Sequence, residues 1–198
     1  MKVKLKFSIR DVQVEVAIQN VVASARIEQN IDLKAVFRAF PDVDYRPEVF
    51  PGLAFKLERP KSSTLIFDNG KMICTGAKSE RQARRAVLNV LREFRSAGII
   101  TSSKYEFTVQ NIVATIEISG VQIDVEETAY AIHSLGEKVM YEPDQFSGAI
   151  YRMKDPKVVF LIFHSGKLVC AGAKREEEIS RVVEKIITIL DENKLLAR

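Results

Sequence analysis

Two asparagines hold the same place in a motif that the chain writes twice, and their amides could hydrogen-bond to a ligand. Asn20 lies in the stretch IQNVVA and Asn111 in VQNIVA. If these stretches are strands, Asn20 shares a face with Val22 and Asn111 shares one with Val113. Such an amide can be a turn residue or a satisfied core group. It can also donate to N3 of adenine or O2 of thymine in a DNA minor groove.

Eight basic residues at equivalent positions of a longer duplication could bind phosphate groups. Residues 50–78 recur as residues 146–174, with matching positions 96 apart. One such lysine would be an ordinary solvated charge, but four symmetric pairs fit the two phosphate backbones of a duplex. The pairs are Lys56 with Arg152, Lys61 with Lys157, Lys71 with Lys167, and Lys78 with Lys174.

Composition sets broad limits on the protein. The 198 residues are 46% hydrophobic, which is ample for a core, and a net charge of +4 suits polyanions without proving them. The first residues alternate lysine with apolar residues instead of forming a signal peptide, and no run reaches the roughly 18 to 20 apolar residues of a membrane span. We therefore expect a soluble, intracellular protein. Cys74 and Cys170, equivalent and within apolar runs, are expected to be buried thiols.

Both copies predict the order strand, helix, several antiparallel strands and helix, an α+β pattern. We expect a first repeat at 1–98, a join at 99–104 and a second repeat at 105–198. Copy one predicts strands over 12–27, 53–58, 63–67 and 71–75, a hairpin turn at 68–70, and helices over 31–40 and 79–96. Copy two predicts a strand over 105–118, a hairpin turn at 164–166, and helices over about 125–135 and 175–191.

Two details of the helices are specific enough to check. Leu33, Val36, Phe37 and Phe40 form the apolar stripe of the first helix, which Asn30 or Asp32 can cap. Ser79 and Gln82 form a capping box for the second helix, whose apolar stripe consists of Ala83, Val87, Leu91 and Phe94.

One face of the predicted sheet should be apolar and uncovered. Residues 158–163 are apolar at both odd and even positions, whereas a strand with one wet face should alternate. Two helices per repeat can cover only one face. The other is either the interior of a closed barrel or sandwich, or a surface for a partner. If Leu65 and Phe67 lie on that face, so do Leu161 and Phe163.

These repeated motifs resemble the two halves of the TATA-box-binding protein core domain. The motif pairs are QNVVAS with QNIVAT, FPGLAF with FSGAIY, and LIFDNGKMICTGAK with LIFHSGKLVCAGAK, and the resemblance runs from about Val14 to Leu190. It implies two pseudo-symmetric repeats forming one curved antiparallel sheet, a saddle, with two helices per repeat on its convex face. Without a long amino-terminal extension the chain is most similar to the archaeal form. We then expect a cytoplasmic, nucleoid-associated protein, or a nuclear one if the source is eukaryotic.

The resemblance implies a general transcription initiation factor. It would bind TATA-box DNA in the minor groove, kink it by inserting phenylalanines, and recruit transcription factor B and RNA polymerase. This mechanism is known for the family and does not follow from the residues alone. The alternative is a saddle of the same fold that binds proteins or non-promoter DNA. The intercalating residues implied by motif match are Phe50, Phe67, Phe146 and Phe163, although Phe67 and Phe163 could instead be core residues of their strands.

The same match assigns contacts to the bases. It places Asn20, Val22, Leu65 and Thr75 of copy one, and Asn111, Val113 and Leu161 of copy two, against the bases. Copy two departs at Ala171, where the family threonine is missing, so that half should lack one polar base contact. Val49 stands where many relatives carry a basic residue, which puts a phosphate contact near Phe50 in doubt.

A further implied site binds transcription factor B through the acidic loop that carries Glu142, Asp144 and Gln145. The closing helices also differ in charge: residues 78–95 carry a net +4 and residues 174–192 a net −2. Both could be plain solvated faces, or could give a nearly symmetric protein a direction on its site. A homodimer through the apolar face is possible when DNA is absent.

Nothing in the sequence indicates an enzyme. His133 and His164 lie in unrelated places, the lysine-containing motifs do not match the phosphate-binding G-x-x-x-x-G-K-[ST] pattern, and no ligand spacing suggests zinc. We expect no cofactor, no metal and no catalytic residue.

Overall fold

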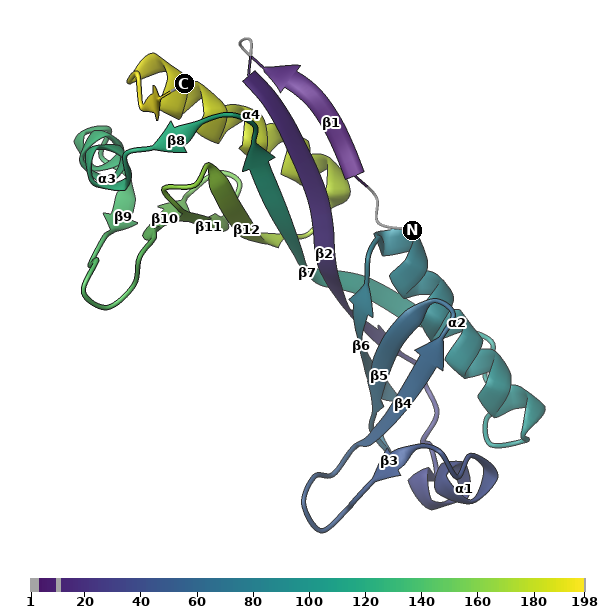
Figure 1. Cartoon of the computed structure of the whole chain (residues 1–198). Coiled ribbons are helices and arrows are strands. Elements are labelled where there is room, and N and C mark those ends of the chain that lie inside the picture. The colour runs from purple at the N-terminus through teal and green to yellow at the C-terminus, as the bar shows by residue number, and fades with distance from the viewer. Residues whose placement is uncertain (1–3, 10–11, 198) are drawn as a thin grey trace. The chain divides into compact units, whose positions relative to one another are not determined.

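The chain forms two compact units, described here from a computed structural model of residues 4–9 and 12–197 (Figure 1). The middle unit is Asn20–Gln110, and the terminal unit joins Met1–Gln19 to Asn111–Arg198. These divisions fall inside two long strands, β2 (Val12–Arg26) and β7 (Glu106–Ile118), so each strand contributes to both units. The predicted repeats at 1–98 and 105–198 follow the duplicated sequence, and as domain boundaries they stay a prediction.

The middle unit is one sheet with two helices. Its strands follow the order β7-β2-β6-β5-β4-β3, and β2 and the strands from β6 to β3 pair antiparallel with their neighbours. The helix α2 packs against β5 and β6 (Figure 1). The remaining bounds are α1 Leu33–Ala39, β3 Asp44–Tyr45, β4 Leu53–Glu58, β5 Lys61–Ile66, β6 Lys71–Ala77 and α2 Glu80–Ser96.

The terminal unit repeats this arrangement with two additions, a further strand and a small second sheet. Its main sheet follows the order β1-β2-β7-β12-β11-β10-β9, in which β1 (Lys4–Ile9) is the added strand and pairs antiparallel with the first part of β2. Helix α4 packs against β12, and a small second sheet pairs β8 with β13. The remaining bounds are β8 Gln122–Ile123, α3 Val125–Ser134, β9 Lys138–Met140, β10 Ala149–Met153, β11 Val158–Ile162, β12 Lys167–Ala173, α4 Glu176–Glu192 and β13 Leu196–Ala197.

The α+β class, with an antiparallel sheet and two helices in each repeat, is confirmed. Ser79 Oγ accepts the N–H of Gln82 at 3.1 Å, as a capping box requires. The return bond differs from the prediction, because Gln82 Oε1 accepts from the N–H of Lys78 and not from that of Ser79. The stripe Ala83, Val87, Leu91 and Phe94 is fully buried, as predicted.

The first helix is shorter than predicted. It spans Leu33–Ala39, and the carboxylate of Asp32 caps it by accepting from the N–H of Ala35 at 3.0 Å. Phe37 was predicted in the apolar stripe but is 46% exposed, because its ring packs at the surface against that of Tyr45, 6.0 Å away. Within this helix only Leu33 and Val36 of the predicted stripe are buried.

Several short strands escaped prediction. The strands β3, β8, β9 and β13 have two or three residues each, too few for a periodic pattern, and the six-residue β1 was not predicted either. The strand β5 starts two residues before the predicted strand and ends one residue before its end, and β6 ends two residues after the predicted end. Cys74 and Cys170 are buried free thiols, as predicted, and burial raises the pKa of Cys170 to about 12. Within the described residues, no helix is long and apolar enough to cross a membrane.

Candidate nucleic-acid interface

Each unit has a sheet face that its helices leave uncovered. In the middle unit Val21 and Ile66 are fully buried on the helix side, whereas their neighbours Val22 and Leu65 are only half-buried. In the terminal unit the half-buried residues are Val113 and Leu161, next to the fully buried Ile112 and Ile162. The open apolar face is therefore present, and partial exposure distinguishes it from the interior of a barrel or sandwich.

The two asparagines are held in matching orientations at the open faces. Asn20 Oδ1 accepts the N–H of Gly76 at 2.7 Å, and Asn111 Oδ1 accepts the N–H of Gly172 at 2.7 Å. A backbone N–H can only donate, so the bonded atom must be the carboxamide oxygen. Each Nδ2 is then directed away from that bond, and each asparagine keeps its two donor hydrogens.

Two glycines make these bonds possible. The strand register shifts beside each glycine, in β6 against β2 and in β12 against β7, which frees its N–H from the ladder. The φ angles of +94° at Gly76 and +112° at Gly172 favour glycine over any residue with a side chain. The sequence singled out the asparagines but gave no sign of this bond.

The two copies differ around the asparagine oxygen. Thr75 Oγ1 lies 3.5 Å from Asn20 Oδ1, a long hydrogen bond, so this oxygen has two donors. In the terminal unit Ala171 occupies the equivalent position and offers no hydroxyl. The two copies therefore differ in the number of hydrogen bonds that hold the asparagine amide, with two at Asn20 and one at Asn111.

Ala171→Thr should change DNA binding. We expect it to tighten binding of an A·T-rich duplex by about two- to tenfold, the range of one net hydrogen bond, or to shift the half-site preference. Fluorescence anisotropy on duplexes labelled at either end measures both effects. Thr75→Ala is the matched control and should act in the opposite direction. Equal binding of parent and Ala171→Thr to both orientations would contradict the prediction.

The four predicted intercalating phenylalanines form two ring pairs. Phe50 and Phe67 have centroids 5.9 Å apart at 64°, and Phe146 and Phe163 have centroids 5.7 Å apart at 69°. Phe50 is 42% exposed and Phe146 36%, which is unusual for large aromatic side chains. Each unit therefore presents an edge-to-face aromatic pair at its surface.

A glycine lies directly under each ring pair. A Cβ at position 52 would lie 2.7 Å from Phe50 Cε1 and 3.2 Å from Phe67 Cε1. At position 148 it would lie 2.9 Å from Phe163 Cε1 and 3.0 Å from Phe146 Cε1. The absence of a side chain thus lets both rings sit where they do. The repeated F-x-G of the two motifs was the available sequence signal.

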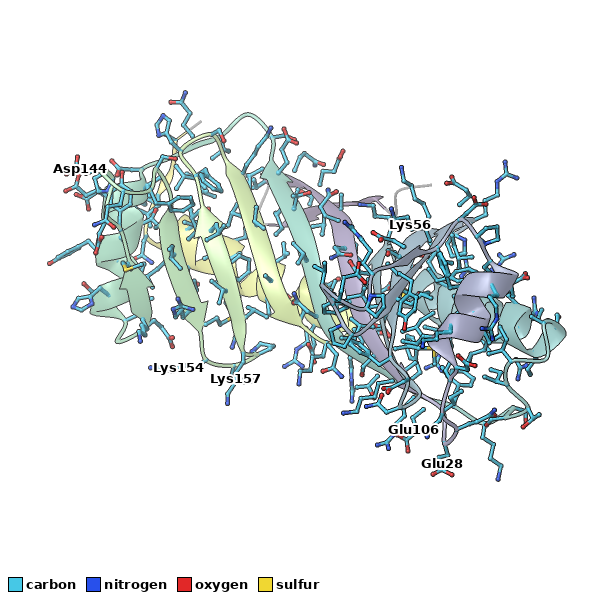
Figure 2. The ribbon with its side chains drawn as sticks, turned by 90° about the horizontal axis from the view of Figure 1, so that it is seen from below. Glu28, Lys56, Glu106, Asp144, Lys154 and Lys157 are labelled. Carbon is cyan, nitrogen blue, oxygen red and sulfur yellow. The ribbon has the colours of Figure 1, made fainter. Side chains whose placement is uncertain are left out.

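The predicted basic residues lie around these faces. Lys78 is half-buried and the other seven are exposed. Lys56 pairs with Ser63, which pairs with Thr75, so this lysine lies on the cross-strand row of a predicted base contact. Arg152 lies on the equivalent row with Val159 and Ala171. Lys157 projects from the hairpin end of its sheet in Figure 2.

Hollows beside Phe67 and Phe163 carry opposite charge. The first, of about 360 Å³, is lined by Arg26, Lys71 and Glu106 among others, and Lys71 lies opposite Arg26. The second, of about 330 Å³, is lined by Glu15, Glu117 and Lys167 among others, and Lys167 lies opposite Glu117. A net positive hollow attracts phosphate and a net negative one repels it.

Neutralising Glu117 should strengthen binding to DNA. Glu117→Gln removes one repulsive charge next to Lys167, and we expect affinity to rise by about two- to fivefold at low salt. Anisotropy titrations at several salt concentrations test this, because screening should erase the gain as salt increases. Glu126→Gln, an exposed substitution on α3, is the control. A gain that persists at high salt would contradict an electrostatic cause.

The predicted acidic loop lies between β9 and β10. Glu142, Asp144 and Gln145 are all exposed, and the carbonyl of Glu142 accepts the N–H groups of Gln145 and Phe146 at 2.9 Å. Figure 2 shows Asp144 at the periphery of its unit. The loop is thus an ordered turn that leads directly into a predicted intercalating residue.

The equivalent loop of the middle unit has the same turn but different charges. The carbonyl of Arg46 accepts from Val49 and Phe50 at 3.0 Å. Arg46 also pairs with Asp44 at 3.1 Å, and this hydrogen bond and charge raise the pKa of Arg46. The two loops therefore share a backbone turn and differ in the charge of their side chains.

Two polar pairs near the asparagines were not predicted. Gln19 Nε2 donates to Thr115 Oγ1 at 2.7 Å in the terminal unit, and Gln110 Nε2 donates to Ser24 Oγ at 2.7 Å in the middle unit. The pairs are equivalent, since the glutamines precede Asn20 and Asn111 in the same motif. The repeated motif singles out the glutamines, but it does not indicate their hydrogen-bond partners, which lie on the other long strand.

Comparison with known proteins gives consistent matches. The family model described as transcription factor TFIID, or TATA-binding protein, matches residues 15–97 and 106–193. The TATA-box-binding protein of Sulfurisphaera tokodaii is 46% identical over 177 residues, 89% of this chain and 87% of that protein. That of Methanocaldococcus jannaschii is 43% identical over 178 residues, 90% of this chain and 94% of that protein. A solved structure of Methanococcus jannaschii TBP has a TM-score of 0.78 at 42% identity, covering 89% of this chain and 98% of that one.

Proposed function

Because the chain belongs to the TATA-binding protein family, we propose that it is a general transcription initiation factor that binds TATA-box DNA in the minor groove. The observation that carries this proposal is the matched orientation of Asn20 and Asn111. Their oxygens are occupied by glycine N–H groups, and their donor hydrogens remain for a ligand. The minor groove of A·T pairs displays only acceptors, N3 of adenine and O2 of thymine, so donors on an apolar face suit it.

The open faces would supply the rest of the contact. Val22 and Leu65 in one unit, and Val113 and Leu161 in the other, offer half-exposed apolar surface for the sugars and base edges. The ring pairs led by Phe50 and Phe146 would insert at base steps and kink the duplex. Each unstacked step costs a few kcal/mol, which burial of the apolar face offsets; this family is itself the established example of that mechanism. Flexible TA steps lower the cost and so favour TATA sequences.

The basic residues would bind the phosphate backbones. Seven of the eight are exposed and free to reach a duplex, and four pairs at equivalent positions suit two strands. Their contribution should appear as a steep loss of affinity with salt, because bound phosphates release counterions. The residues proposed for this role are Lys56, Lys61, Lys71, Lys78, Arg152, Lys157, Lys167 and Lys174.

A binding comparison tests the proposal. The protein should shift a TATA duplex at concentrations where a G·C-rich duplex of equal length stays free, because the guanine amino group blocks the minor groove. Replacing Asn20 and Asn111 with alanine should remove most of this preference. Equal binding to both duplexes would favour a sequence-indifferent DNA-binding module, and no binding to either would favour a protein-binding module.

Transcription factor B and RNA polymerase are the proposed partners on DNA. The exposed loop of Glu142, Asp144 and Gln145 offers a directional contact, since its counterpart in the middle unit carries Arg46. A homodimer of the DNA-free protein through the apolar faces also stays a prediction. Sedimentation of the free protein and of its DNA complex measures it.

A further inference from the structure

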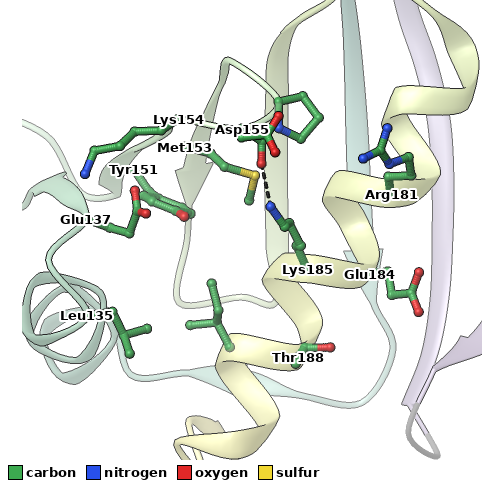
Figure 3. Close-up of a pocket in the computed structure, with 12 residues that line it drawn as sticks. Leu135, Glu137, Tyr151, Met153, Lys154, Asp155, Arg181, Glu184, Lys185 and Thr188 are labelled. Atoms are coloured by element: carbon green, nitrogen blue, oxygen red, sulfur yellow. Dashed lines mark hydrogen bonds between the residues drawn. The ribbon is translucent and has the colours of Figure 1, made fainter.

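A cavity of about 590 Å³ lies on the helix side of the terminal unit (Figure 3). Tyr151 and Met153 of β10 face it and are buried, whereas Arg152 between them lies on the opposite, exposed side of the strand. Helix α4 closes the cavity with Lys185 and Ile189. The cavity is therefore separated by the sheet from the proposed DNA-binding face, and its volume suits a small ligand.

The corresponding region of the middle unit is filled with aromatic rings. Phe40, Phe55 and Phe94 form a cluster with centroid distances of 5.2, 5.9 and 5.6 Å. Tyr151 and Leu190 stand 96 residues after Phe55 and Phe94 in the terminal unit. One of the rings has therefore become an aliphatic chain and another has gained a hydroxyl, while Phe160, 96 residues after Thr64, adds a ring that stacks on Tyr151 at 6.2 Å.

An equivalent bond between a helix and a hairpin is present beside this region in both units. Asn89 Nδ2 donates to the carbonyl of Arg59 at 3.4 Å in the middle unit. Lys185 Nζ donates to the equivalent carbonyl, that of Asp155, at 2.5 Å (Figure 3). A helix is thus tied to the same hairpin in both copies.

An acceptor in the cavity wall lacks a partner. Glu137 Oε2 is inaccessible to solvent and forms no hydrogen bond among the described residues. Figure 3 shows the Glu137 carboxylate beside Tyr151, and burial followed by the charge of Glu137 raises the pKa of Tyr151 to about 12. The ammonium of Lys154 donates instead to the carbonyl of Gly136 at 3.1 Å. A buried carboxylate oxygen without a donor is costly, which points to a group supplied from outside.

We propose that this cavity binds an alkylammonium or alkylguanidinium group. The cationic N–H would donate to the Glu137 carboxylate once this side chain turns its inaccessible oxygen toward the cavity, forming the charge-assisted bond that the oxygen lacks. The alkyl chain would lie against Leu135, Met153 and Ile189, which supply the apolar part of the lining. This site does not depend on the proposed DNA binding.

Titration of the full chain with n-butylammonium and n-butylguanidinium tests the site. Amide resonances of cavity-lining residues should shift in the millimolar range expected for so small a ligand. Glu137→Gln should weaken binding by about tenfold or more, because the charge-assisted bond is lost. Glu184→Gln, an exposed carboxylate at the same cavity, is the matched control and should bind within about twofold of the parent.

Two further measurements keep the test decisive. Ile189→Phe places a ring in the cavity without touching Glu137, and should abolish the shifts while DNA binding stays unchanged. Three outcomes would overturn the proposal. They are equal shifts with butyrate, parental affinity in both Glu137→Gln and Ile189→Phe, and no shifts with either cation.

The same experiment distinguishes two sources of the cation, a lysine of a partner protein and a free amine. Nα-acetyl-lysine N-methylamide carries the same alkylammonium on a peptide-like backbone. Tighter binding of this compound than of n-butylammonium supports the site with a partner protein's lysine as the occupant. Tighter binding of n-butylammonium supports it with a free amine.

Discussion

Substituting valine for Gly148 is expected to weaken binding to a TATA duplex by about ten- to a hundredfold, equivalent to roughly 1.4 to 2.8 kcal/mol. Even a Cβ at this position would lie 2.9 Å from Phe163 and 3.0 Å from Phe146, and valine adds two methyl groups. The ring pair must therefore move from the position that suits insertion. Anisotropy gives the affinity, and energy transfer between labels on the duplex ends gives the bend, which should decrease.

The neighbouring Ser147→Val is the matched control, since it introduces the same valine side chain at an adjacent, exposed position. Its affinity should stay within about twofold of the parent, as for most exposed substitutions. Thermal unfolding of both variants separates local movement of the rings from loss of the fold. Parental affinity and bend in Gly148→Val would show that the ring pair does not need this geometry.

Reversing the charge of Glu142 and Asp144 to lysine is expected to abolish recruitment of transcription factor B and spare DNA binding. Both side chains are exposed in a turn whose backbone bonds do not involve them. The substitutions should thus leave the loop intact while replacing attraction with repulsion, and two like-charge contacts cost several kcal/mol at an interface. A gel supershift of the DNA complex by factor B measures the effect.

Glu48→Lys is the control for that experiment. Glu48 stands 96 residues before Asp144, in the equivalent loop of copy one, and is also exposed. It should leave the supershift unchanged if factor B reads only the loop of copy two. A supershift that survives reversal at Glu142 and Asp144 would end this assignment.

The sequence predicted those elements whose signal is local and long. The stripe of α2 and the hairpin turn at 68–70 follow from spacing within one segment, and duplication supplied each pattern twice. The open apolar face was predicted because residues 158–163 are apolar at both odd and even positions, and because two helices per repeat can cover only one face of the sheet. These features needed no knowledge of distant contacts.

The features that escaped prediction depend on contacts between segments. The bond from Gly172 to Asn111 joins strands far apart in sequence and arises from a register shift that no local pattern encodes. Glu15 and Glu117 line one hollow with Phe163, although each lies in a different strand. Phe37 lies in the predicted helix, but its ring packs at the surface against Tyr45, a contact that the helical spacing does not predict.

The long strands β2 and β7 have a consequence for how the chain can be divided. Residues 12–19 of β2 belong to the terminal unit and residues 20–26 to the middle unit, and β7 is divided in the same way. A single repeat expressed alone would lack the strand portion that the other repeat lends it. Cutting the chain at the predicted join would therefore leave each unit without one of its strand segments.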